Sequence, residues 1–271
     1  MVEFVIKSNG QKEAYQKEKV IQSLKRLNLS QEKIEEILGE IDQKLPSVIS
    51  TKKLFDFIFS SLKEKEPTFS YKYNIKQAIF KLGPAGYPFE KFIAHLLKLY
   101  GYQTKHNLFL KGKCLTYEID LLAEKDNITY IGECKFHQQA WKVNDVKVVQ
   151  YSYARFLDIQ KENEYPWVIT NTRFTSEAHK FAECYNIKLL SWNFPEENLP
   201  YLIYNKKAYP LTIFDFLPLK AIQKLFSYDI ILIQDIIKKD KSYLKKISGL
   251  DEMTIQKIFD IINNILGELT S

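Results

Sequence analysis

The residues of this chain best suited to chemistry lie between Tyr117 and Phe136, in the run Tyr-Glu-Ile-Asp-Leu-Leu-Ala-Glu-Lys-Asp-Asn-Ile-Thr-Tyr-Ile-Gly-Glu-Cys-Lys-Phe. Asp126-Asn127 suits a two-residue type I′ turn, because both residue types tolerate a left-handed backbone. A hairpin centred on this turn places Asp120 opposite Glu133, with Cβ atoms about 5 Å apart. Two carboxylates this close repel each other unless a cation lies between them. The hairpin therefore predicts a divalent metal site.

Alternation along the two strands predicts which side chains share a face of the hairpin. Those expected to point toward a core are Ile119, Leu121, Ala123, Tyr130, Cys134 and Phe136. Those expected on the opposite face are Glu118, Asp120, Glu133 and Lys135. The second set is polar and contains both proposed metal ligands.

Ligation by the carboxylates of Asp120 and Glu133 alone suits a hard ion, Mg²⁺ or Mn²⁺. Lys135 follows Glu133 by two residues on the same face, where its amine would contact a water or a phosphate beside the ion. Such a set favours phosphodiester hydrolysis, because the ion polarises the phosphate while the lysine orients water or offsets developing charge. The alternative is a set of solvated charges on an exposed sheet, which opposed like charges disfavour.

The elements around the hairpin predict an α/β domain with a mixed sheet. Strands are expected over 102–111, 116–124, 128–136, 167–170 and 187–191. Helices are expected over 89–100, 144–160 and 176–185. This αβββαβαβ order requires helices to flank a sheet of mixed strand direction.

The helix with Glu90, the strand with Asp120 and the strand with Glu133-Cys-Lys135 resemble the PD-(D/E)xK nuclease superfamily. Residues 87–192 are most similar to its Mrr-type restriction endonuclease branch. The resemblance implies that Asp120 and Glu133 ligate Mg²⁺, that Lys135 is catalytic and that Glu90 is an auxiliary acid near the metal. A solvent-facing role for Glu90 on its helix is the alternative.

Three further positions bear on this resemblance. The superfamily has a proline before its aspartate, where this chain has Ile119. Some relatives carry a glutamine on the following helix, and Gln150 is a candidate for it or an ordinary helix-surface residue. His137 would either approach the phosphate or serve a structural role after the strand.

The N-terminal segment predicts a hairpin followed by helices. Strands are expected over 2–7 and 11–15 around an Asn-Gly turn. Helices are expected over 17–27, 31–44 behind Ser30, 52–63 behind Thr51 and 71–82 behind Ser70. Gly83-Pro84 then marks a boundary.

Residues 2–84 resemble the ATP-cone, a regulatory nucleotide-binding module known from ribonucleotide reductases. The matching stretches are Val5-Ile-Lys-Ser-Asn-Gly-Gln-Lys-Glu13, Lys17-Glu-Lys19 and Thr51. The resemblance implies that Lys7 and Lys19 contact the phosphates of ATP. The family usually carries a basic residue where this chain has Leu82-Gly-Pro84, with Lys81 as a substitute. A docking surface without nucleotide binding is the alternative.

The segments after residue 192 predict a connector and a helical region. Residues 193–210 contain three prolines and suggest a connector, whereas 211–271 shows only helical periodicity. The run Tyr243-Leu-Lys-Lys-Ile-Ser-Gly-Leu-Asp-Glu-Met-Thr-Ile-Gln-Lys-Ile258 resembles a helix-hairpin-helix unit, whose glycine would let backbone N–H groups approach a DNA phosphate. A helical hairpin used for dimerisation is the alternative.

The composition argues against a membrane protein and against a protein held together by disulfides or zinc. The 271 residues are 45% hydrophobic and carry a formal charge of +6, which supports nucleic-acid binding weakly because only three residues are arginine. No apolar run approaches the roughly 18 residues of a membrane span. Three scattered cysteines indicate neither disulfides nor a structural zinc site. We therefore expect a soluble cytoplasmic protein.

The combined prediction is a multidomain protein in four parts. These are a mainly α ATP-cone-like domain with a small hairpin (1–84), a PD-(D/E)xK nuclease core (85–195), a linker (196–210) and an all-α DNA-binding region (211–271). Its expected activity is Mg²⁺-dependent hydrolysis of DNA, most simply double-stranded, by a homodimer under ATP control. The rival hypothesis is a catalytically inactive DNA-binding or scaffold protein that responds to nucleotide.

Overall fold

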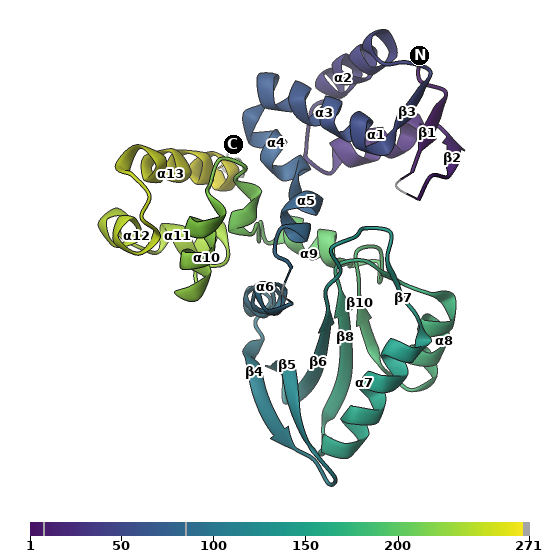
Figure 1. Cartoon of the computed structure of the whole chain (residues 1–271), viewed down its shortest axis with the longest axis vertical. Helices are drawn as coiled ribbons and strands as arrows, with labels where there is room; N and C mark the ends of the chain where they lie inside the picture. The colour runs from purple at the N-terminus through teal and green to yellow at the C-terminus, as the bar shows by residue number, and fades with distance from the viewer. Residues whose placement is uncertain (8, 85, 268–271) are drawn as a thin grey trace. The chain divides into compact units, whose positions relative to one another are not determined.

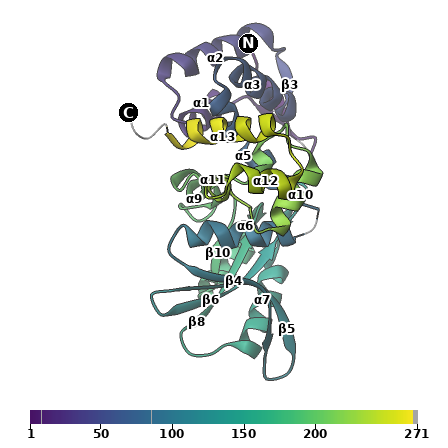
Figure 2. The ribbon, with the colours of Figure 1, turned by 90° about the vertical axis from the view of Figure 1, so that its left-hand side faces the viewer.

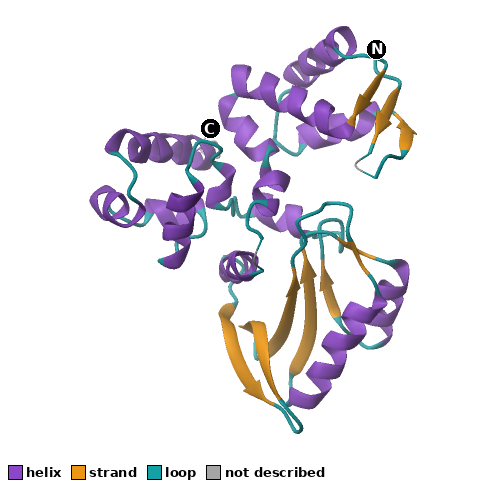
Figure 3. Cartoon of the chain, in the orientation of Figure 1, coloured by secondary structure: helices purple, strands orange, loops and turns teal. Residues whose placement is uncertain are grey.

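The computed structural model describes residues 1–7, 9–84 and 86–267 (Figure 1). The chain separates into two compact units, Met1–Lys76 and a second unit that begins at Gln77. It combines a helical N-terminal unit that carries a small sheet, an α/β core with a mixed sheet and a helical C-terminal region, as the sequence predicts (Figure 3). No helix in the described ranges has the length and apolar character that crossing a bilayer requires.

The N-terminal unit has a three-stranded sheet in the order β2-β1-β3. Strand β1 (Phe4–Ile6) pairs antiparallel with β2 (Lys12–Ala14), so the predicted hairpin is confirmed. Strand β3 (Val48–Ser50) pairs parallel with β1. The sequence analysis missed β3, because three residues are too few to show strand alternation.

The helices of this unit confirm one predicted cap and correct two. Helix α2 (Gln31–Lys44) follows Ser30, whose hydroxyl accepts from Lys33 N. The cap of α3 (Thr51–Lys65) is Ser50 rather than Thr51. Ser70 lies inside α4 (Pro67–Tyr73), where its hydroxyl donates to Pro67 O. Pro67 explains the error, since its fixed φ favours a helix start.

Two further helices complete this part of the chain. Helix α1 covers Lys17–Lys25. A helix break at Asn74 separates α4 from α5 (Ile75–Phe80), so the predicted helix 71–82 is two shorter ones.

The second unit contains a five-stranded sheet in the order β10-β8-β6-β5-β4. Its strands are β4 (Gln103–Lys111), β5 (Thr116–Lys125), β6 (Ile128–Lys135), β8 (Glu164–Thr170) and β10 (Lys188–Leu190). The first three pair antiparallel, and β6, β8 and β10 are parallel. All five agree with the predicted strands, and the mixed direction is confirmed.

Helices cover the two faces of this sheet. Helices α7 (Val146–Ile159) and α8 (Ser176–Cys184) pack on one face through Val149 and Ala178. Helix α6 (Tyr87–Lys98) contacts β4, where Thr104 Oγ1 donates to Ala94 O at 3.2 Å. Figure 2 shows α6 crossing one end of the sheet. A short parallel pair, β7 (Val143–Asn144) and β9 (Arg173–Phe174), immediately precedes α7 and α8 respectively.

The segment predicted as a linker, 196–210, contains a short packed helix. This helix is α9 (Leu199–Asn205), in which Leu199 and Ile203 are fully buried. The Tyr100 hydroxyl donates to Leu202 O at 3.0 Å, which ties α9 to the end of α6. Three prolines suggested a connector, but Pro200 lies in the first turn of α9, where proline is well tolerated.

The C-terminal region is helical and attached to α6. Its elements are η1 (Leu211–Ile213), α10 (Leu219–Ser227), α11 (Ile233–Ile237), α12 (Lys241–Ser248) and α13 (Glu252–Gly267). Lys91 of α6 donates to Phe226 O at 3.1 Å, and His95 Nδ1 lies 3.1 Å from Asp235 Oδ2. Both side chains of α6 are nearly buried, so these contacts anchor the region to the sheet domain.

Candidate active site

The β5–β6 hairpin has the predicted turn and register. Asp126 and Asn127 have φ values of 52° and 61°, the left-handed conformation that a type I′ turn requires. The ladder runs from Lys125↔Ile128 to Leu121↔Gly132. Continued by one residue, this register places Asp120 opposite Glu133.

The predicted faces are wrong at Ile119. This side chain packs with Ile131 and Phe156 on the α7 face, whereas Leu121 lies on the other face. In the register of β4 with β5, Asn107 falls opposite Asp120, and its φ of 53° interrupts the regular alternation there. Asp120 therefore lies where the pleat of the sheet reverses, an irregularity that a period-2 pattern does not predict.

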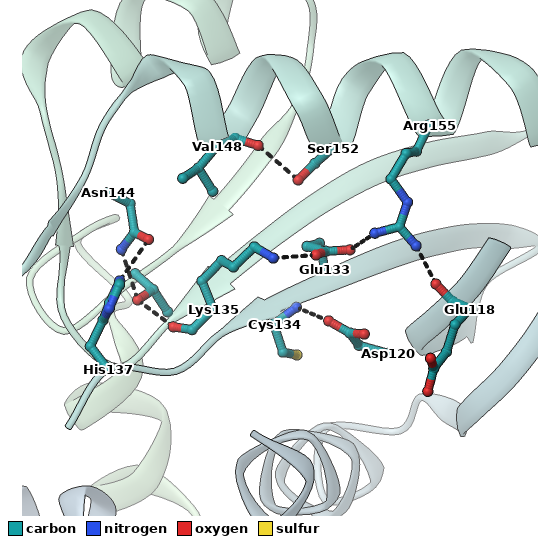
Figure 4. A network of polar contacts seen from close by, with 11 residues as sticks. Glu118, Asp120, Glu133, Cys134, Lys135, His137, Asn144, Val148, Ser152 and Arg155 are labelled. Atoms are coloured by element: carbon teal, nitrogen blue, oxygen red, sulfur yellow. Dashed lines mark hydrogen bonds and ion pairs between the residues drawn. The ribbon is translucent and has the colours of Figure 1, made fainter. Parts of the chain in front are cut away.

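Glu133 is held by two cations at the end of β6 (Figure 4). Its Oε1 accepts from Lys135 Nζ at 2.5 Å, and its Oε2 accepts from Arg155 Nη1 at 2.7 Å. Arg155 Nη2 also donates to the backbone O of Glu118. Glu133 is only 9% exposed, so these contacts satisfy a charge that burial would otherwise make costly.

Arg155 is the member of this site that the sequence analysis did not assign. It lies on α7 and joins that helix to β6 through Glu133. Its rarity was a usable signal, since only Arg26, Arg155 and Arg173 are arginines in a chain rich in lysine. The guanidinium of Arg155 donates to Glu133 Oε2 and to Glu118 O at once, which the planar fork of arginine allows and the single amine of lysine does not.

Asp120 and Glu90 share an acidic environment with Glu133. Asp120 Oδ2 accepts from Cys134 N at 2.7 Å. Burial, with repulsion from Glu133, raises the pKa of Asp120 to about 6. Burial, with repulsion from Asp120 and from Glu118, raises the pKa of Glu90 to about 7. The tertiary fold thus brings Glu90 of α6 close enough for the carboxylates of the hairpin to repel its charge.

A buried polar network fixes the strand end that carries Lys135. Thr170 Oγ1 donates to Lys135 O at 2.7 Å and accepts from Asn144 Nδ2 at 3.0 Å. His137 Nε2 lies 2.9 Å from Asn144 Oδ1, and His137 N donates to Asn171 Oδ1 at 2.8 Å. His137 therefore participates in positioning the strand end.

Gln150 lies on the exposed side of α7, whereas Ser152 and Arg155 of the same helix lie toward the sheet. A role for Gln150 beside the metal stays a prediction.

The carboxylates of Asp120 and Glu133 suit a magnesium ion that takes only a few ligands from the protein. Among the residues described, no three His, Cys, Asp or Glu side chains are grouped to hold a metal. Mg²⁺ commonly uses only one or two carboxylates together with water and substrate phosphate. Asp120 and Glu133 supply two, and the raised pKa of Asp120 marks a site where negative charge lacks compensation. A divalent cation would provide it.

The raised pKa values predict how the metal-free protein responds to pH. A carboxyl group with a folded-state pKa above its unfolded value stabilises the fold at low pH and loses this contribution as pH rises through the folded pKa. Stability of the second unit in EDTA should therefore fall between pH 4 and pH 7 through Asp120 and Glu90. Asp120→Asn should weaken this fall and melt higher than wild type at pH 8. A thermal melt of both proteins at pH 5 and pH 8 checks it, and identical pH dependence would contradict it.

The candidate nucleotide-binding lysines lie in the N-terminal unit. Lys7 Nζ pairs with Glu13 Oε1 at 2.5 Å across the β1–β2 hairpin. Lys19 is exposed in the first turn of α1, where free backbone N–H groups favour phosphate. Lys81, the proposed substitute for the missing basic residue, is exposed after α5.

The predicted C-terminal helical hairpin is present. Helices α12 and α13 are separated by Gly249, whose φ of 76° is left-handed, and Gly249 N donates to Lys245 O at 3.0 Å. Lys257 lies over the ring of Phe216, with Nζ 4.3 Å from the centroid. Phosphate binding at this hairpin stays a prediction.

Family comparisons agree with the three resemblances along the chain. The ATP cone domain matches residues 3–78, and the restriction endonuclease family Mrr_cat matches 85–193. The family described as AF1548-like, C-terminal, matches 209–266. An uncharacterised protein of Archaeoglobus fulgidus is 34% identical over 177 residues, which is 65% of this chain and 100% of the relative. The chain belongs to the AF1548-like family.

One solved structure supports the AF1548-like assignment. The crystal structure of AF1548, a protein of unknown function, is 33% identical with a TM-score of 0.60, covering 68% of this chain and 100% of that one. The MspJI restriction endonuclease in complex with a 27-mer oligonucleotide is 13% identical with a TM-score of 0.35, covering 51% of this chain and 31% of that one. The family matches confirm the predicted ATP-cone and Mrr-type domains, and the segment with the C-terminal hairpin matches the AF1548-like C-terminal family.

Proposed function

We propose that this AF1548-like protein is a metal-dependent endonuclease that hydrolyses DNA phosphodiester bonds. The supporting observation is the juxtaposition of Asp120, Glu133 and Lys135 near the end of β6, with the half-buried acid Glu90 nearby. Asp120 and Glu133 would hold Mg²⁺ or Mn²⁺, which when bound polarises a phosphate and lowers the pKa of a water.

The protein side chains divide the remaining tasks. Lys135 Nζ donates to Glu133 Oε1 beside the proposed metal position, and it would orient the attacking water or offset charge on the phosphate. Arg155 keeps the other oxygen of Glu133 in place. Glu90 is half-buried and would serve as the auxiliary acid. One such site cuts one strand, so a double-strand break favours a homodimer.

A plasmid-nicking assay with Mg²⁺ and with EDTA tests this function. Conversion of supercoiled to open-circular DNA with Mg²⁺, and none with EDTA, is the expected result. DNA binding without cleavage under any divalent ion would favour the rival, an inactive DNA-binding or scaffold protein.

We also propose that the N-terminal unit binds ATP, which its match to the ATP cone family supports. If ATP binds at Lys7 and Lys19, coupling to the nuclease should change DNA affinity about 5- to 150-fold, and DNA should change ATP affinity by the same factor. Lys7→Ala should remove this ATP effect, because it removes a phosphate contact, and should spare cleavage without ATP.

Calorimetry with ATP on the full chain, followed by DNA binding with and without ATP, measures both quantities. Lys12→Ala is the matched control, because Lys12 is an exposed lysine of the same hairpin whose amine lies over the Phe4 ring. No heat at millimolar ATP would leave a docking role for this unit.

A further inference from the structure

Four aromatic side chains of the second unit gather on the sheet, from β6, from β8 and from the residue before β4. We define them as the aromatic patch: Tyr102, Tyr130, Tyr165 and Trp167. Tyr130 pairs with Ala123 on one side and with Tyr165 on the other. Because alternate residues share a face, Trp167 lies on the same face as Tyr165. This is the face of Leu121, opposite the α7 face of Ile131.

The rings of the patch form one connected surface. Tyr130 lies 5.2 Å from Trp167, 6.3 Å from Tyr165 and 6.2 Å from Tyr102, measured between ring centroids. Trp167 is only 3% exposed, so it is the floor of the patch, whereas Tyr165 is 43% exposed. A large aromatic side chain this exposed beside a buried indole is available to stack on a planar partner.

Two lysines lie at the patch without a carboxylate partner. Lys188 Nζ lies 3.9 Å from the Trp167 ring centroid and 4.5 Å from that of Tyr130. Lys125 Nζ lies 5.3 Å from the Tyr102 centroid and donates to Tyr100 O. Within the described ranges, neither amine has an Asp or Glu oxygen within 4.0 Å. Their charges are therefore free to meet an anion.

The floor of the patch also has an unused hydrogen-bond donor. Trp167 Nε1 is buried and has no acceptor among the residues the structure describes. A buried donor without a partner is uncommon in folded proteins and indicates a group that is missing. An acceptor-rich, planar and anionic ligand would meet the requirements of the ring surface, the lysines and this donor together.

We propose that the aromatic patch, with Lys125 and Lys188, binds a single-stranded DNA segment whose bases stack on the exposed rings. Aromatic stacking beside positive charge is how proteins hold single strands without reading sequence. Tyr130 precedes Glu133 by three residues on β6, so their side chains point to opposite faces of the sheet, and Glu133 faces Arg155 of α7. The patch would therefore hold a single strand on the face opposite the proposed cleavage site, and the choice of DNA over RNA rests on the proposed nuclease function.

Fluorescence anisotropy of a fluorescein-labelled oligothymidylate, with full-length protein in EDTA, tests this site. Tyr165→Ala should weaken binding about 5- to 150-fold, which corresponds to the loss of one base stack. Tyr165→Phe should retain the affinity, because it keeps the ring. Tyr185→Ala, which removes a tyrosine of similar 49% exposure just after α8, should also bind like wild type.

Three other outcomes would each overturn the proposal. Equal affinity for wild type and Tyr165→Ala, or no binding by wild type, removes the site. Tighter binding of oligouridylate than of oligothymidylate replaces DNA by RNA. A smaller sedimentation coefficient for Tyr165→Ala, with unchanged oligonucleotide affinity, makes the patch an interface between two copies of the chain. If the protein binds through Tyr165 but no plasmid is nicked, the nuclease function fails while this site stands.

Discussion

Asp120→Asn is expected to abolish Mg²⁺-dependent nicking while leaving binding of plasmid DNA intact. The substitution keeps the shape of the side chain but removes the charge that would hold the metal. Mutating groups that merely support a metal ligand costs about 10- to 100-fold in affinity or activity, so removing a ligand should cost more. Loss of a negative charge from a phosphate-binding surface also reduces repulsion, so DNA affinity should not fall.

Asp126→Asn provides the matched control in the same hairpin. Asp126 is exposed in the turn, where asparagine tolerates the same left-handed backbone. Its nicking rate should equal that of wild type. Nicking by Asp120→Asn at the wild-type rate would remove Asp120 from the site and, with it, the pairing of carboxylates on which the proposed function rests.

Arg155→Met is expected to lower the free energy of unfolding of the second unit by about 3 kcal/mol, because it leaves the buried Glu133 charge with one partner fewer. The side chains of Arg155 and Glu133 are only 15% and 11% exposed, so water replaces the lost contact poorly. Nicking should fall as well, since Glu133 loses the group that orients it.

Urea denaturation followed by tryptophan fluorescence measures the change in stability. All three tryptophans, Trp141, Trp167 and Trp192, lie in the second unit, so the signal reports on that unit alone. Arg173→Met, at an exposed arginine, should change stability little. In a Glu133→Gln background, Arg155→Met should lower the free energy of unfolding by less than it does in wild type. An equal loss would show that the packing of Arg155, rather than its ion pair with Glu133, stabilises the fold.

Lys91 and His95 join α6 to the C-terminal region, so deleting that region would affect stability as well as DNA binding. The two side chains leave α6 toward Phe226 and Asp235, and Thr212 Oγ1 donates to Ala78 O at 2.7 Å. Deleting residues 211–271 would expose these buried polar groups as well as remove any DNA contact. Substitutions at exposed lysines of the α12–α13 hairpin, such as Lys246→Ala, separate DNA binding from stability.

Local sequence alone determined the hairpin and the core of the candidate site. Asp126-Asn127 sets the turn, and the turn sets the register through Leu121↔Gly132, because a two-residue loop leaves no freedom of pairing. The helix α7 could also be predicted, because the apolar period of its fourteen residues is long enough to recognise. Acid and lysine positions on β5 and β6 followed directly.

Only the tertiary structure decided which distant groups join that hairpin. Glu90 and Arg155 come from two helices whose approach depends on how each packs against the sheet. The reversal of the strand pleat at Asp120 depends on the left-handed backbone of Asn107 on the neighbouring strand. The helix α9 is recognised only from the burial of its side chains in the folded chain. These features arise from contacts between residues far apart in the chain, whereas propensity and periodicity describe neighbours along it.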